Sequence, residues 1–207
     1  LVLNTTASNN TAVGYQAAYS NTTGERNTAM GVQSLYTNTT GSFNSAFGRT
    51  ALYYNTTGQQ NVANGQDALF SNTTGSYNVA IGKSALETNT TASNNTAVGY
   101  QAGYSNTTGV DLTAIGYKAG NANTTGTYNT FVGKDAGLSN TTSGLSSYFG
   151  EYSGRLATGQ GNTFLGQQSG HSITSGAKNT IIGRYTGNGG GLDIRTSSNN
   201  IVLSDGD

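Results

Sequence analysis

The first candidate for chemistry in this sequence is the tripeptide Asn-Thr-Thr, which recurs along most of the chain. An asparagine two residues before a threonine is the acceptor pattern for N-linked glycans. Eleven asparagines fit this pattern and are the candidate glycan acceptors: Asn4, Asn9, Asn21, Asn38, Asn55, Asn72, Asn89, Asn94, Asn106, Asn123 and Asn140. Two other interpretations stay open, because stacked asparagines can form a hydrogen-bonded ladder in a turn, and the threonines of the tripeptide could form an ice-binding strip.

Catalytic and metal-binding chemistry has no support in the residue pattern. A zinc site needs several His or Cys ligands, whereas the chain has one histidine, His171, and no cysteine. The nine Asp and Glu residues are scattered, so a calcium-binding Gly-Asp repeat is not indicated. The glycine-rich segment 187–191 lacks the Lys-Ser/Thr of a phosphate loop and is expected to be a turn or cap. We therefore expect a non-enzyme with no catalytic residue, no metal and no cofactor.

Tyrosine provides the second candidate surface. Five tyrosines follow a recurring glycine by one or two positions, with glutamines between them: Tyr15, Tyr100, Tyr117, Tyr152 and Tyr185. Exposed tyrosines on a rigid sheet can stack on sugars. The alternative is that they are ordinary strand residues.

The recurring glycine organises all these candidates. It stands at Gly14, Gly31, Gly48, Gly65, Gly82, Gly99, Gly116, Gly133, Gly150, Gly166 and Gly183, and every step is 17 residues except one of 16. We number positions from this glycine, so Val13 is position −1 and Tyr15 is position +1. A constant period indicates one structural unit stacked many times.

The unit is too short for an ordinary helix, and alternation such as Thr130 and Val132 is typical of short strands. The sequence therefore predicts an all-β fold, a parallel β-solenoid of eleven 17-residue coils over residues 1–187. Coils stacked at roughly 4.8 Å would make a rod of roughly 50 Å.

Side-chain types at equivalent positions predict the core. Position −1 is apolar in ten of eleven coils and is expected to face inward: Val13, Met30, Phe47, Asn64, Ile81, Val98, Ile115, Val132, Phe149, Leu165 and Ile182. Positions +1 and +2 are often polar and are expected to face solvent. In the earlier coils position −2 is Ala and position +4 is mostly Leu, whereas in the later coils position −2 is mostly aromatic and position +4 is Gly. Because one position becomes larger where the other becomes smaller, the two are predicted to meet across one core. Both positions are small near Gly103 and Gly120, and what fills that gap stays open.

The two ends differ from the repeat. Leu1 falls in the phase of Leu35, so we expect the sequence to be a slice of a longer protein. Residues 188–207 are predicted to be a cap or a transition to another domain, with strands over Leu192–Thr196 and Asn200–Ser204. Alternation places Asp193 and Arg195 on one strand face, where they can pair.

The segment "NTAVGYQAGYSNTTG" at residues 95–109 carries a family resemblance. "NTAVGxxA" and "NTFVGxxA" resemble the "NSVAIGxxA" repeat of YadA-like heads in trimeric autotransporter adhesins and of phage tail-fibre proteins. The resemblance covers roughly residues 4–187. It implies a left-handed parallel β-roll, three chains around one axis and a role in attachment. The period here is longer, with extra residues in the Asn-Thr-Thr turn.

Two apolar columns give a separate argument for assembly. Besides position −1, position +5 is largely aromatic, with Tyr19, Tyr36, Tyr53, Phe70 and Tyr104. A 17-residue coil encloses little volume, so one thin core cannot use both columns. We therefore expect a homotrimer or filament, intertwined or side by side.

The whole composition narrows the function. The formal net charge is zero, which leaves no basic footprint for nucleic acid. The sequence has no apolar run of 18 residues, so membrane insertion is not expected. We expect an attachment-fibre shaft on a virion or cell surface that holds a receptor-binding tip at a distance and contacts cell-surface glycans. The alternatives are an extracellular filament coated with N-glycans and an ice-binding solenoid.

Overall fold

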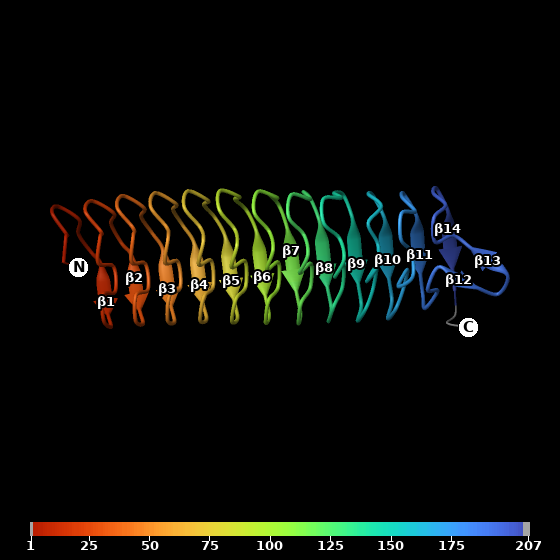
Figure 1. Cartoon of the computed structure of the whole chain (residues 1–207), viewed down its shortest axis with the longest axis horizontal. Coiled ribbons are helices and arrows are strands. Elements are labelled where there is room, and N and C mark those ends of the chain that lie inside the picture. The colour runs from red at the N-terminus through yellow and green to blue at the C-terminus, as the bar shows by residue number, and fades with distance from the viewer. Residues whose placement is uncertain (1, 205–207) are drawn as a thin grey trace.

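The computed structural model describes residues 2–204 as a straight, all-β rod without a helix in that range. Figure 1 shows the coils following one another from the N-terminal end to the C-terminal end, with one short strand per coil. This arrangement confirms the predicted β-solenoid.

Fourteen short strands make up the regular structure of the described residues. They are β1 (Thr11–Val13), β2 (Thr28–Met30), β3 (Ser45–Phe47), β4 (Val62–Asn64), β5 (Val79–Ile81), β6 (Thr96–Val98), β7 (Thr113–Ile115), β8 (Thr130–Val132), β9 (Ser147–Phe149), β10 (Thr163–Leu165), β11 (Thr180–Ile182), β12 (Asn188–Gly189), β13 (Leu192–Asp193) and β14 (Ile201–Leu203). Each of β1–β11 therefore occupies positions −3 to −1 of its coil.

The sheet is parallel and its strands follow sequence order, β1 to β11 and then β14. Equivalent residues pair, as in Thr11 with Thr28, so the register repeats the 17-residue period. The single 16-residue step pairs Ser147 of β9 with Thr163 of β10. A register fixed by repetition places every side chain above its equivalent in the next coil.

The C-terminal region departs from its predicted boundary at residue 187. β14 pairs in parallel with β11, with Thr180 opposite Ile201, so residues 188–204 supply a twelfth coil rather than only a cap. β12 and β13 form an antiparallel hairpin inserted into this coil. Both β13 and β14 are shorter than the strands predicted there, and residues 205–207 of the predicted cap lie outside the described residues.

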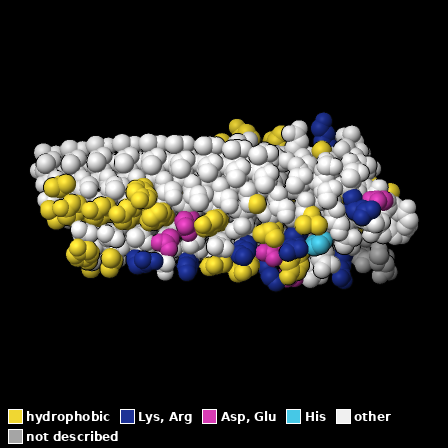
Figure 2. Space-filling model, viewed as in Figure 1, with side chains coloured by type: hydrophobic (Ala, Val, Ile, Leu, Met, Phe, Trp, Pro, Cys, Tyr) yellow, Lys and Arg dark blue, Asp and Glu magenta, His cyan; other side chains and the backbone are white. Residues whose placement is uncertain are grey.

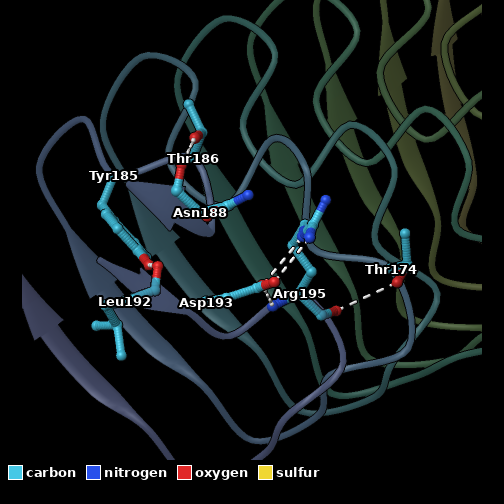
Figure 3. Close-up of polar contacts among 7 residues, drawn as sticks. All are labelled: Thr174, Tyr185, Thr186, Asn188, Leu192, Asp193 and Arg195. Atoms are coloured by element: carbon cyan, nitrogen blue, oxygen red, sulfur yellow. Dashed lines mark hydrogen bonds and ion pairs between the residues drawn. The ribbon is translucent and has the colours of Figure 1, made fainter. Parts of the chain in front are cut away.

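The hairpin is fastened by the polar contacts drawn in Figure 3. Arg195 pairs with Asp193 as the alternation predicts, with Nη2 to Oδ2 at 2.7 Å. The Tyr185 hydroxyl donates to the Leu192 carbonyl at 2.6 Å. The glycine-rich segment forms the turn between β12 and β13, as expected for residues with positive φ.

The recurring glycine is required where each strand ends. Gly65 has φ +144°, and a Cβ added there would lie 2.5 Å from the carbonyl oxygen of Gly82 in the next coil. The same close approach of backbone to backbone recurs at each recurring glycine from Gly14 to Gly183. A side chain would therefore push neighbouring coils apart, which explains the strict period.

The core lies under position −2 and not under position −1, so the prediction for position −1 was wrong. Position −2 residues from Ala29 to Ile181 are fully buried, whereas Val13, Met30 and Phe47 at position −1 are exposed. Successive strand residues point to opposite faces. With three-residue strands, burying position −2 forces positions −3 and −1 outward.

The predicted exchange of volume between positions −2 and +4 is confirmed. Where position −2 is Phe131, a Cβ added at Gly120 or at Gly137 would lie 2.7 Å from the Phe131 ring. Position −2 is Ala in the earlier coils, and Leu35, Leu52, Leu69 and Leu86 fill the core from position +4. Aromatic side chains and leucines thus occupy the same narrow space from opposite sides.

Side chains of this chain fill the space left open by the sequence near Gly103 and Gly120. A Cβ at Gly103 would meet Leu86 at 3.0 Å and Leu112 at 3.2 Å, and Gly120 lies against Phe131. No neighbouring chain is needed there.

Candidate functional site

The asparagines of Asn-Thr-Thr, at position +7, form an internal ladder. Asn38 Nδ2 donates to Oδ1 of Asn21 at 2.7 Å and to the carbonyl of Gly41 at 2.8 Å. The same pair of bonds recurs at Asn55, Asn72, Asn89, Asn106 and Asn123, with Ala92 taking the glycine's place for Asn89. The predicted ladder of stacked asparagines is therefore present, and each side chain both closes its own turn and ties two coils together.

A second asparagine ladder, which the sequence interpretation missed, runs along position −4. The Oδ1 of Asn27 accepts from the backbone N–H of Asn44 at 2.9 Å, and Asn44 Nδ2 donates to the Gly58 carbonyl at 2.9 Å. Leu112 interrupts this ladder, although its backbone N–H still donates to Asn95 Oδ1 at 2.9 Å. The signal was visible as an asparagine four residues before most of the recurring glycines.

Burial of the first ladder removes most of the candidate glycan acceptors from the surface. Eight of the eleven are fully buried: Asn21, Asn38, Asn55, Asn72, Asn89, Asn106, Asn123 and Asn140. Asn4, Asn9 and Asn94 are exposed. A glycan needs the side-chain amide nitrogen, which is the donor atom of the ladder. The folded coil is therefore open to this modification at the three exposed asparagines alone.

The two threonines of each tripeptide have different environments. At position +8 the hydroxyl is used inside the fold, as Thr39 Oγ1 donates to the Thr56 carbonyl at 3.1 Å. At position +9 the side chains are exposed, as at Thr23, Thr40 and Thr57. Both lie in a bend rather than in a strand. The strip proposed for ice, which included Thr22, Thr39 and Thr56, thus has its hydroxyls engaged by the neighbouring coil.

An apolar stripe runs along the outer face of the sheet. We use this name for eight residues at position −1 whose exposed fractions lie between 37% and 55%: Val13, Met30, Phe47, Ile81, Ile115, Phe149, Leu165 and Ile182. Position −3 on the same face is mostly Thr, Ser or Val. The stripe carries no charge and extends over the length of the rod.

Aromatic residues at position +5 stack on one another along the rod. The rings of Tyr19, Tyr36, Tyr53 and Phe70 follow at centroid distances of 5.1 to 5.3 Å and are half-buried. Burial raises the pKa of Tyr53. Rings stacked in this way cover one another's faces, so the column presents edges rather than faces to a ligand.

The five tyrosines singled out as a surface do not share one environment. Tyr15, Tyr100 and Tyr117 are exposed and Tyr152 is half-buried. Tyr185 is buried, with its hydroxyl on the Leu192 carbonyl, so its place in the predicted surface was wrong. The reason is the hairpin β12–β13, which folds over it. Position +2 is in general more buried than predicted, as Thr50, Ser84 and Asp135 also show.

Charged residues gather along the margin formed by positions +1, +2 and +5, most densely in coils 7 to 11. Figure 2 shows them mixed with hydrophobic side chains along the lower margin, toward the C-terminal end. Lys134 Nζ donates to the Tyr152 hydroxyl at 2.7 Å and lies 3.5 Å from Glu151. The hydrogen bond to Tyr152 is the main cause that raises the pKa of Lys134.

The single histidine belongs to this margin. His171 is half-buried at position +5, and its ring meets Tyr152 edge-on at 6.3 Å. Burial, followed by the nearby Arg155 charge, lowers the pKa of His171. Among residues 2–204, no three His, Cys, Asp or Glu side chains cluster as metal ligands would. No helix in that range is long and apolar enough to cross a membrane.

Comparisons with known proteins found no counterpart. A scan against protein-family models, a search of curated proteins and a search of solved structures each gave no match.

Proposed function

We propose that this chain is a non-enzymatic shaft segment of an attachment fibre on a virion or cell surface, which assembles as a homotrimer and holds a receptor-binding tip at a distance. The observation that carries the proposal is the apolar stripe. It lies uncovered on the single chain along the full length of the rod. Contiguous exposed apolar surface of this kind marks an interaction site in soluble proteins.

Further copies of the same chain are the partner that fits the stripe best. Position −1 repeats once per coil, in step with the sheet, and eight of its eleven residues belong to the stripe, so a partner that follows the stripe along the rod needs the same period. An identical chain satisfies this condition at every coil. The number three comes from the resemblance to YadA-like head repeats and not from the stripe itself.

A mechanical role agrees with how the coils are joined. Backbone hydrogen bonds and two asparagine ladders connect each coil to the next, and the core is continuous along the axis. A stack of this kind resists bending, because bending must lengthen hydrogen bonds on one side. Such stiffness suits a spacer between an anchor and a tip.

The alternative of a glycan-coated filament is less favoured by the geometry. Eight of its eleven candidate acceptors are buried in the ladder. The ice-binding alternative is also less favoured, because the threonine hydroxyls at position +8 already donate hydrogen bonds to the next coil. Neither alternative uses the apolar stripe.

The test measures the number of chains per particle by light scattering and the length of the rod by small-angle X-ray scattering, both on the purified protein. We expect a trimeric rod. Phe47→Ser, Ile81→Ser and Ile115→Ser together should reduce it to monomers of unchanged length. The matched control is Phe43→Ser, Tyr77→Ser and Tyr128→Ser, which removes exposed apolar side chains from position −5 instead. A monomeric parent at high concentration, or equal loss of assembly in the control, would refute the proposal.

A further inference from the structure

The charge along the margin of positions +1, +2 and +5 is uneven. In coils 7 to 11 it carries four cations, Lys118, Lys134, Arg155 and Arg184, and two carboxylates, Asp135 and Glu151. We call these four cations the basic edge. In coils 1 to 6 the same positions carry two cations and two carboxylates, Arg49, Lys83, Asp67 and Glu87. The margin of coils 7 to 11 therefore has more cations than carboxylates, in a chain whose formal net charge is zero.

The two carboxylates of the same margin offset part of the charge of the basic edge and leave an excess of cations. Glu151 pairs with Lys134 on the surface, at 3.5 Å with both side chains well exposed, and such pairs are weak and screened. Asp135 is 8% exposed and has no cation within ion-pair distance among the described residues. Lys118 and Arg184 are likewise without a carboxylate partner in the described structure.

Cations cover the faces of the tyrosines in this region. Lys118 Nζ lies 5.5 Å from the centre of the Tyr117 ring, and Tyr100 stacks against Tyr117 at 5.4 Å. Lys134 Nζ and Arg155 Cζ lie 4.9 and 5.7 Å from the centre of the Tyr152 ring. Neutral sugars need an open aromatic face for stacking. These rings instead lie against the cations Lys118, Lys134 and Arg155.

From this arrangement we propose that the basic edge binds an anionic polysaccharide, through its carboxylate or sulfate groups, rather than a neutral glycan. The edge spans four coil steps from Lys118 to Arg184, roughly 20 Å at the spacing of neighbouring strands. A linear polyanion laid along the rod can therefore meet several cations at once, and each contact releases bound counterions. This proposal rests on the proposed function, because a shaft held against a cell envelope is where such a polymer would be met.

The test measures binding of the whole chain to alginate, which carries carboxylates, and to neutral dextran of similar length at low salt. We expect binding to alginate that weakens as salt rises, and little binding to dextran. Lys118→Gln, Lys134→Gln and Arg184→Gln together should weaken alginate binding by about tenfold or more, as expected when most contacts to a polyanion are removed.

The matched control removes the same amount of charge elsewhere, with Arg26→Gln, Arg49→Gln and Lys178→Gln, and should stay within about twofold of the parent. Equal binding to dextran, no binding to alginate or an equal loss in the control would overturn the proposal. Equal affinity for a short DNA duplex would also overturn it, since the edge would then be a general polyanion site. Small-angle scattering on the same samples separates the proposal of a trimeric shaft from the proposal of polysaccharide binding. A trimeric rod that does not bind alginate would contradict only the polysaccharide proposal.

Discussion

At the scale of single residues, asparagine shows how position decides chemistry. Asn94 and Asn89 both fit the glycan acceptor pattern, yet Asn94 is exposed and Asn89 is fully buried in the ladder. Buried side-chain amides are tolerated because donor and acceptor are both used. Where the ladder ends, at Asn140, neither side-chain atom has a partner, and Ala157, Ile173 and Ile194 occupy the following coils.

This contrast predicts opposite effects of one substitution at two equivalent positions. Asn72→Ala removes bonds to Asn55 and Gly75 and strips Asn89 of its acceptor, so we expect a loss of about 1–3 kcal/mol in the free energy of unfolding. Asn140→Ala removes an amide without partners and should be nearly neutral or stabilising. Denaturant unfolding of both variants checks this, and equal losses would contradict the role assigned to the ladder.

The hairpin gives a pH prediction at the same scale. The hydrogen bond from the Arg195 side chain lowers the pKa of Asp193 to about 2. A carboxyl with a lowered pKa favours the folded hairpin at pH above its unfolded value of about 3.9, and that preference disappears as the pH falls through about 2. In Arg195→Gln the pKa of Asp193 should rise toward about 3.9. An NMR titration of the Asp193 carboxyl measures it, and an unchanged pKa would show that Arg195 is not the cause.

At the scale of elements, the three-residue strand explains both the success and the failure of the sequence interpretation. The 17-residue period, the turn and the exchange between Leu35-type and Phe131-type positions follow from spacing and volume, which a sequence displays directly. The sequence does not show whether the side chain at position −1 faces the core or solvent, because a three-residue strand has too few alternating residues to identify its inner face. Burial of Tyr185 depended on the hairpin inserted into the twelfth coil, and no local pattern indicates that this hairpin packs over the ring.

Backbone geometry at each strand end predicts which glycines are irreplaceable. Gly65→Ala should destabilise the rod by several kcal/mol, since the added methyl would meet the Gly82 carbonyl oxygen at 2.5 Å and φ is +144°. Gly190 in the hairpin turn also has positive φ, +55°, but nothing lies within 4 Å of its added methyl. Gly190→Ala should therefore cost only about 1 kcal/mol. Thermal unfolding distinguishes them, and a harmless Gly65→Ala would mean that the coils can separate without penalty.

At the scale of the whole molecule, each coil depends mainly on its two neighbours, because bonds run from one coil to the next along a single axis. The rod should therefore tolerate a change of length in whole units. Equivalent residues stay above one another when complete periods are removed, so the ladders, the core and the apolar stripe all close again across the junction.

Deleting residues 49–82 joins Gly48 to Lys83 in phase and removes two complete coils. We expect a folded rod that is shorter by about 10 Å, twice the strand spacing, with the same circular dichroism per residue. Deleting residues 57–82 removes a number that is not a multiple of the period, so the step from Gly48 to Gly99 becomes about 25 residues instead of 17, and the amides of this junction coil, including that of Leu86, should be less protected from hydrogen exchange than in the in-phase variant. Small-angle scattering gives the length of each variant. If the junction coil of the out-of-phase deletion were as well protected as that of the in-phase one, stacking of equivalent side chains could not be what holds the coils together.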